Sequence, residues 1–262
     1  MNHLRALFPG GDQPFRLTMR RGDPGEFFGP QDRDGAILSE RATWIDETPQ
    51  RYTAESPGFG ALLQELASLG SAWGLPTVTE AVGLGRQWEP DVLLLARGED
   101  GAFRLRGGAL CFPSGWALEE KLGLTLPEIH GVVPGLNPAI GRAIDQFLAN
   151  LRPGPAFLRD NWGIAATAEL NLHPARGLPG PTLPIQLDRL WLRVEHQALV
   201  AFPSGQGIVF GIRIALHRLD HVSADRELAA ALAQALRTMP PELARYKRLD
   251  TVWTTLATTL GV

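Results

Sequence analysis

The chain has 262 residues, of which 44% are hydrophobic and 20% are charged, and its formal net charge is −3. These values are ordinary for a globular protein, and they offer no strong basic field to nucleic acid or to an anionic membrane. The single cysteine, Cys111, excludes an intramolecular disulfide and an iron–sulfur cluster held by thiolates. No apolar signal core follows Met1, and no stretch approaches the roughly 20 apolar residues of a membrane span. We therefore expect a cytoplasmic protein.

The first 57 residues are rich in proline, glycine, aspartate and arginine and carry isolated aromatic side chains. This composition predicts an irregular arm that lies on the core rather than a separate domain. We expect its aromatic side chains to pin it there: Phe15, Phe27, Phe28, Trp44 and Tyr52. Residues 58–262 then form one domain.

One helix and a pair of strands are predicted next in the chain. Leucines and a tryptophan recur at helical spacing over residues 60–73, which predicts an amphipathic helix. Residues 91–95 and 102–112 are apolar, and the turn-forming sequence Gly98-Glu99-Asp100-Gly101 separates them. This arrangement predicts two strands joined by a hairpin.

A second helix is predicted over residues 137–151. Asn137 is positioned to cap it, and Pro138 occupies its first turn. Further along, Ser223 is predicted to cap a helix that runs to Arg237, and a final helical stretch follows the break at Pro240-Pro241.

Two long strands are predicted between these helical regions, over residues 190–202 and 207–216. Pro203-Ser204-Gly205-Gln206 joins them and is typical of a hairpin turn. Hairpins flanked by helices indicate an α+β fold, in which helices pack on a mostly antiparallel sheet.

Familiar catalytic motifs are missing from the sequence, which has no phosphate-binding loop, dinucleotide fingerprint, nucleophile elbow or zinc-protease motif. Ser114, in Phe112-Pro113-Ser114-Gly115-Trp116, has no neighbouring base to activate it, so a serine nucleophile is disfavoured. None of the six histidines pairs with other ligands at metal-binding spacing, which disfavours a zinc site.

Two polar features are candidates for chemistry. His130 lies in an apolar segment shaped by proline and glycine, and taken alone such a histidine is more often a hydrogen-bonded core residue than a ligand. In the strand around residue 195, alternation places Arg193, Glu195 and Gln197 on one face and His196 on the other. These polar side chains either face solvent or line a polar cofactor pocket, and the alternation fits both.

Six short segments stand out in chain order. They are Cys111-Phe112-Pro113-Ser114-Gly115-Trp116, Glu120-Lys121-Leu122-Gly123, Ile129-His130 with Val133-Pro134-Gly135, Arg159-Asp160-Asn161-Trp162, Arg193-Val194-Glu195-His196-Gln197 and Arg245-Tyr246-Lys247. Their order and approximate spacing resemble those of the alpha subunits of heme-dependent oxidative N-demethylases, over residues 90–250. The first 60 residues do not share this resemblance.

The resemblance implies a PAS-like fold, with a curved antiparallel sheet and flanking helices that hold heme b. It also implies a histidine axial ligand whose other ring nitrogen is hydrogen-bonded to a carboxylate. Carried over residue by residue, His130 is the iron ligand and Glu195 is the carboxylate, while His196 is a rival ligand. Such a carboxylate orients the imidazole and makes it a stronger donor to iron.

Four further residues are candidates for binding the heme. Arg159 and Arg193 match its propionates, because a guanidinium pairs with a carboxylate in a fork, although each fits a surface salt bridge equally well. Trp116 and Trp162 are candidate walls of the pocket or, alternatively, ordinary core aromatic residues.

These assignments lead to three functional hypotheses. The first is a heme-dependent oxidoreductase that removes a methyl group from a small secondary amine as formaldehyde. Its electrons would come from a separate flavin or iron–sulfur reductase, because the chain has no nicotinamide or flavin fingerprint. The second is a heme-binding PAS-like sensor or carrier without turnover, and the third is an interaction module that has lost heme.

Overall fold

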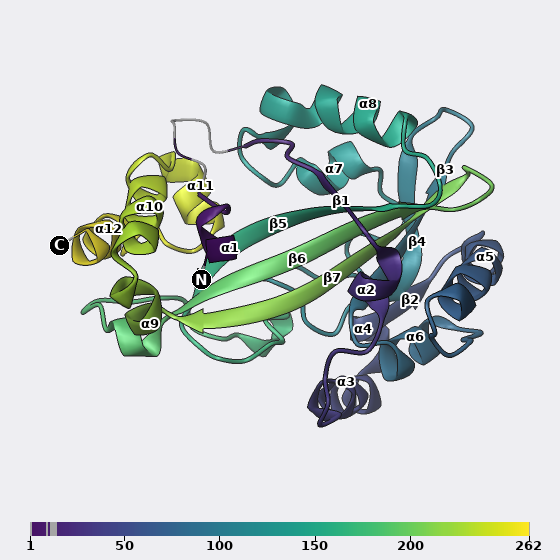
Figure 1. Ribbon diagram of the computed structural model, residues 1–262, viewed down its shortest axis with the longest axis horizontal. Coiled ribbons are helices and arrows are strands. Elements are labelled where there is room, and N and C mark those ends of the chain that lie inside the picture. Colours follow the sequence, from purple (N-terminus) through teal and green to yellow (C-terminus); the bar gives the residue numbers. More distant parts are fainter. Residues whose placement is uncertain (1, 9, 11–14, 262) are drawn as a thin grey trace.

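The computed structural model describes residues 2–8, 10 and 15–261. Within these residues, seven strands form one curved sheet in which every neighbouring pair is antiparallel (Figure 1). From one edge to the other, the strands are β1 (Arg20–Gly22), β5 (Ala156–Ala165), β6 (Trp191–Ala201), β7 (Gly207–Arg218), β3 (Asp91–Arg97), β4 (Phe103–Ala109) and β2 (Thr53–Glu55). The predicted α+β class is confirmed.

Helices lie on both faces and at both ends of this sheet. The helices are α1 (Asn2–Arg5), α2 (Pro24–Phe28), α3 (Ala36–Glu47), α4 (Pro49–Tyr52), α5 (Phe59–Ala72), α6 (Ala81–Gln87), α7 (Leu126–His130), α8 (Arg142–Ala149), α9 (Leu219–Ala224), α10 (Arg226–Arg237), α11 (Pro241–Tyr246) and α12 (Trp253–Leu260). Figure 1 shows α9–α12 gathered with α1 at one end of the long strands β5–β7. Helices α7 and α8 run along the β5 side, and α3–α6 lie at the far corner beside β2 and β4. No helix in the described part of the chain combines the length and the apolar character needed to cross a membrane.

The predicted hairpins and the first predicted helix are confirmed. Strands β3 and β4 pair around the turn at residues 98–102, and β6 and β7 pair over their full lengths. Helix α5 covers residues 59–72 and buries its leucine stripe against the sheet.

Two predicted helix starts are wrong. Asn137 does not cap its helix, because its side-chain N–H donates to the carbonyl of Pro127 at 2.8 Å, and residues 137–141 form a π-helical turn before α8. Ser223 lies inside α9, where its hydroxyl donates to the carbonyl of Asp220. The cap of α10 is instead Asp225, whose carboxylate accepts the Leu228 N–H at 3.1 Å.

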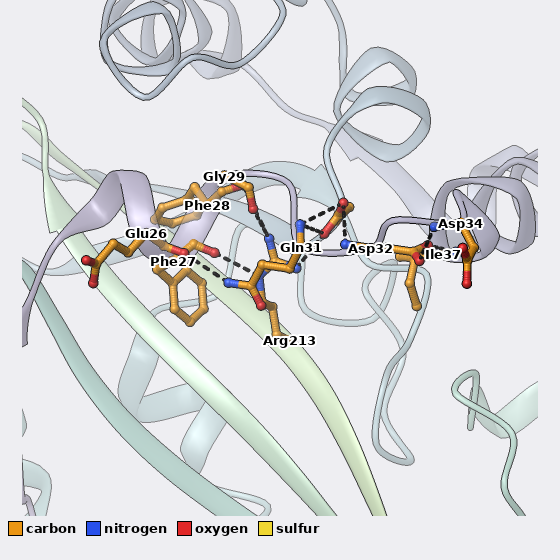
Figure 2. Close-up of polar contacts among 10 residues, drawn as sticks. Glu26, Phe27, Phe28, Gly29, Gln31, Asp32, Asp34, Ile37 and Arg213 are labelled. Atoms are coloured by element: carbon orange, nitrogen blue, oxygen red, sulfur yellow. Dashed lines mark hydrogen bonds and ion pairs between the residues drawn. The ribbon is translucent and has the colours of Figure 1, made fainter.

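The N-terminal segment is fastened to the sheet by one arginine of β7 (Figure 2). The Nε of Arg213 donates to the Phe27 carbonyl at 2.7 Å, and its Nη2 donates to the Gly29 carbonyl at 2.6 Å. Its Nη1 pairs with the buried Glu89 at 2.8 Å, and Glu89 also accepts the backbone N–H of Gln31. A buried charge needs this degree of pairing.

The same segment contributes aromatic anchors, as predicted for Phe27, Phe28 and Tyr52, which are buried. Gly211 of β7 makes room for them, since a Cβ at this position would lie 2.5 Å from a ring atom of Phe28. The ring of Phe28 in turn stacks on Trp73 at 4.8 Å between centroids.

Residues 1–57 also carry regular structure that the expected irregular arm did not include. Strands β1 and β2 extend both edges of the sheet, and α3 is a helix of 12 residues. The buried residues of α3 are Arg41 and Ile45, which lie one turn apart. This helix of polar composition therefore packs on the rest of the protein along a narrow stripe. Residues 1, 9 and 11–14 of the arm lie outside the described residues, and a domain boundary at residue 57 stays a prediction.

Candidate functional site

The middle of the sheet is covered unequally on its two faces. On one face, the side chains of Val194, Ala198 and Val200 in β6 are no more than 1% exposed. On the other face, which α7 and α8 cover, Leu199 of β6 and Phe210 of β7 are only half-buried. Side chains on central strands are normally covered completely, so this second face, called the α7 face below, keeps apolar surface accessible.

A polar cluster interrupts the apolar α7 face at its centre. Glu195 is 7% exposed, and its Oε2 accepts hydrogen bonds from Asn161 at 3.2 Å and Gln197 at 2.8 Å. Asn161 lies opposite Glu195 in the register of β5 and β6, and Arg159 lies opposite Gln197. The alternation predicted for Arg193, Glu195 and Gln197 is therefore confirmed, and the three residues share one face.

Arg159 brings a positive charge into this cluster. Burial lowers the pKa of its guanidinium, while the carboxylates of Glu195 and Asp160 raise it. The side chain is half-buried, and no side chain or carbonyl of the described residues accepts a hydrogen bond from it. A half-buried guanidinium with open donors is suited to bind an anionic group of a ligand.

His130 approaches the cluster from the end of α7. The helix is fixed by a capping box between Thr125 and Glu128, with Pro127 in its first turn. Burial lowers the pKa of the half-buried His130 imidazole, and the charge of Arg159 lowers it further, against an opposing effect of Asp145. The ring is therefore neutral at pH 7 and has a lone pair to donate to a metal.

Glu195 and His130 are not joined by a hydrogen bond among the described residues, since Oε2 of Glu195 is held by Asn161 and Gln197. The carboxylate whose charge acts on His130 is Asp145 of α8. The assignment of Glu195 as the partner of the His130 ring stays a prediction.

His196 and Trp162 lie on the opposite side of the sheet from Glu195. The Nδ1 of His196 is 2.6 Å from the carboxylate of Asp160 on β5. Trp162 lies opposite Val194 in the register, and its ring contacts Phe8 edge-on at 5.1 Å. The structure does not bring these two side chains together with the polar cluster.

Arg193 is held entirely by protein acceptors. Its Nε donates to the hydroxyl of Ser114 at 2.7 Å, and its Nη2 donates to the carbonyls of Phe112 at 2.9 Å and Leu170 at 2.7 Å. A weaker contact reaches the Glu169 carbonyl at 3.3 Å. The side chain thus ties the 112–116 loop to the 169–170 loop, and it accounts for Ser114 without a nucleophilic role.

Trp116 packs, half-buried, against the same apolar cluster as Ile129, the neighbour of His130. This contact places it near the end of α7. A separate hollow of ≈ 260 Å³ lies between α7, α8 and the β3–β4 turn, and neither His130 nor Glu195 lines it.

Lys247, to which the sequence patterns assigned no role, lies beside Trp162 at the edge of β5. Its Nζ donates to the Trp162 carbonyl at 2.6 Å, and the charges of Glu195 and Arg159 act on it in opposite directions. Partial burial and the charge of Glu195 raise the pKa of the Tyr246 phenol.

Fold and site together define a class: an α+β protein whose antiparallel sheet holds one neutral histidine near two largely buried arginines and the buried carboxylate of Glu195, with apolar surface around them. The family described as haem-dependent oxidative N-demethylase, alpha subunit-like, matches residues 61–257 of the chain. The chain belongs to this family. By its description the family is haem-dependent, and an alpha subunit implies a partner subunit.

Proposed function

We propose that the chain binds one heme b on the α7 face of the sheet, with His130 as the iron ligand, and removes a methyl group from a small secondary amine. The observation that carries this proposal is that a neutral imidazole from α7 is subject to the charge of Arg159 from β5, whose guanidinium donates no hydrogen bond to the described residues. Both residues belong to segments that resemble the demethylase family, and the family match covers both.

The residues present fit the charge and the apolar character of heme b. Heme carries two carboxylates on an otherwise apolar ring. The carboxylates of Glu195 and Asp160 act on Arg159, but its guanidinium donates no hydrogen bond to the described residues and can therefore pair with a propionate. Half-buried Phe210, Leu199 and Trp116 supply apolar surface for the ring.

When bound, heme supplies the redox chemistry by which oxygen oxidises an N-methyl group that is then released as formaldehyde. In this proposal His130 donates its lone pair to the iron, and Arg159 orients the ring through one carboxylate. Arg193 keeps the 112–116 loop in place, so that Trp116 covers the site. Glu195 supplies the negative charge that favours the ferric state. The apolar strands exclude water, which strengthens each of these charge effects.

Replacing Glu195 with glutamine should raise the Fe(III)/Fe(II) potential of the heme-loaded protein. The change removes one negative charge and keeps an acceptor for Asn161, so the ferric state loses stabilisation. For a one-electron couple about 59 mV corresponds to about 1.4 kcal/mol, so a shift of tens of millivolts is measurable by redox titration.

The matched control for this potential is Asp145→Asn, which removes the carboxylate that acts on His130 from α8. A larger shift in the Asp145 variant than in the Glu195 variant would transfer the role to Asp145. No shift, or a fall, in Glu195→Gln would contradict the assignment.

Turnover should require a separate reductase. The sequence has no glycine-rich strand–helix turn to hold a nicotinamide, so the chain has no place to accept a hydride. We expect heme-loaded protein to release formaldehyde from dimethylamine only after a flavin or iron–sulfur reductase is added to NADPH. Sustained formaldehyde release with NADPH alone would contradict a partner-dependent enzyme. Heme binding without formaldehyde under any reducing condition would instead support a sensor or carrier.

A further inference from the structure

Residues 15–22, called the strap below, are fastened at one end to the outer edge of β5. There β1 pairs with β5, and Arg20 lies opposite Leu158, the neighbour of Arg159. The guanidinium of Arg20 also lies 3.8 Å from the carboxylate of Asp160, the next residue of β5. This end of the strap is therefore fixed beside the arginine that belongs to the polar cluster.

The other end of the strap contacts the loop of residues 131–136, which follows His130 at the end of α7. The ring of Phe15 packs on Gly135, since a Cβ added there would lie 3.7 Å from a ring atom, an ordinary van der Waals distance. Gly135 has φ 77°, so the loop turns through a left-handed conformation at the point of contact. The strap therefore touches the segment that directs the chain away from the proposed iron ligand.

Strap and loop also share two apolar clusters. Phe15 and Val133 both pack on the cluster that α9–α12 form with the sheet. Leu17 and Leu136 both pack on the cluster that α8 forms with the sheet, and Figure 1 shows the strap, in purple, beside α7 and α8. Each cluster thus receives one side chain from the strap and one from the loop.

The exposure of side chains along the strap alternates as in an edge strand. From Phe15 to Arg20, the odd-numbered side chains are half-buried and the even-numbered ones are exposed. The backbone pairs with β5 at residues 20–22, so side-chain packing attaches residues 15–19. Phe15 and Leu17 are both on the half-buried side.

The loop itself depends on side-chain packing for its position. The start of α7 is tied to β4, because the Leu105 N–H donates to the Leu124 carbonyl at 3.0 Å. At the other end, the Val133 N–H donates to the His130 carbonyl at 2.9 Å, and the Leu136 N–H donates to the Val133 carbonyl at 3.2 Å. Among the described residues, the backbone hydrogen bonds of the loop are made within it and to the helical turns on either side of it. A segment without backbone bonds to the sheet opens readily when its packing is lost.

We propose that Phe15 and Leu17 are positioning residues of the heme site: by holding the 131–136 loop they keep the imidazole of His130 in place beside the strand that carries Arg159. This inference rests on the proposed function, in which His130 is the iron ligand. It concerns residues outside the family match, which covers residues 61–257. A ligand held in place loses less conformational freedom when it binds iron, so loss of the strap contacts weakens binding although the ligand itself is still present.

The first measurement needs no heme and follows amide hydrogen exchange in the loop. We expect the Val133 and Leu136 amides to exchange about tenfold faster in the double variant Phe15→Ala, Leu17→Ala than in the wild type, which corresponds to about 1.4 kcal/mol of lost local packing. Equal exchange rates of these amides in the two proteins would overturn the proposal.

The second measurement is the rate at which heme leaves the reconstituted protein for an apomyoglobin acceptor. We expect the double variant to release heme about 10- to 100-fold faster than the wild type, as for the loss of groups that orient a metal ligand. Its bound heme should keep the histidine-ligated spectrum, because the strap does not supply the ligand. Phe15→Leu retains an apolar side chain at this position and should release heme more slowly than Phe15→Ala.

Phe27→Ala is the matched control, because Phe27 is a buried aromatic anchor of the same N-terminal segment and packs at Gly211 of β7. It should lower the midpoint of urea unfolding more than Phe15→Ala does, since Phe15 is only half-buried. Loop exchange and heme release should nevertheless stay within about twofold of the wild type, as for sites that do not share contacts.

Heme release that is as fast in Phe27→Ala as in the double variant would overturn the proposal, because general destabilisation would then explain both. A wild type that takes up no heme would overturn the proposed function, and the exchange rates would then decide alone whether the strap holds the loop.

Discussion

His130→Ala should abolish heme binding and leave the fold intact. Loss of partners that only orient a metal ligand costs about 10- to 100-fold in affinity, so removal of the ligand itself should cost more. The imidazole is half-buried and accepts no hydrogen bond from the described residues, so its truncation removes little packing. The measurement is a spectrophotometric heme titration, with far-UV circular dichroism to check the fold.

The matched control for His130 is His196→Ala. His196 lies on the other side of the sheet, bonded to Asp160 at 2.6 Å, and its removal should leave heme affinity within about twofold of the wild type, as for a surface change. Unchanged heme binding in His130→Ala together with its loss in His196→Ala would show that the iron ligand is His196.

Asp91→Asn should destabilise the protein by about 3–5 kcal/mol, the cost of leaving a buried partner charge alone. Asp91 is 1% exposed and pairs at 2.5 Å with Arg41, which is fully buried. Its carboxylate also accepts the backbone N–H groups of Cys111 at 2.6 Å and Phe112 at 3.0 Å, at the start of the loop that Arg193 holds. Urea unfolding measures the loss.

A surface ion pair provides the comparison for Asp91. Asp46 pairs with Arg86, and both side chains are largely exposed. Asp46→Asn should change the free energy of unfolding by no more than about 1 kcal/mol, because solvent screens the pair. Equal effects of the two substitutions would mean that the Arg41–Asp91 pair is not the buried support that its contacts indicate.

Local patterns in the sequence predicted those elements whose residues determine their own conformation. The β6–β7 hairpin followed from a four-residue turn between apolar runs, and α5 followed from its leucine spacing. Strand β5 gave no such signal, because Arg159-Asp160-Asn161 is polar and poor in strand-forming residues. It is a strand because β6 pairs with it from Phe157 to Ala165.

The candidate site likewise has one part that local sequence patterns predicted and another that only the folded chain creates. Alternation along β6 predicted that Arg193 and Glu195 share a face, which is a local property. The contact of Lys247 with the Trp162 carbonyl joins residues 85 positions apart, and only the path of the chain after α11 creates it. The sequence pattern does not distinguish Arg193, whose partners are loop carbonyls, from Arg159, whose guanidinium donates no hydrogen bond to the described residues.

The central claim, that this chain holds heme b through His130, is tested most directly by the heme content of the purified wild-type protein after reconstitution. A pyridine hemochrome assay and the Soret spectrum give stoichiometry and ligation in one preparation. The account predicts one heme per chain with a histidine-ligated spectrum, and the loss of both in His130→Ala. A wild-type protein that takes up no heme, or one that keeps the same spectrum without His130, would contradict it.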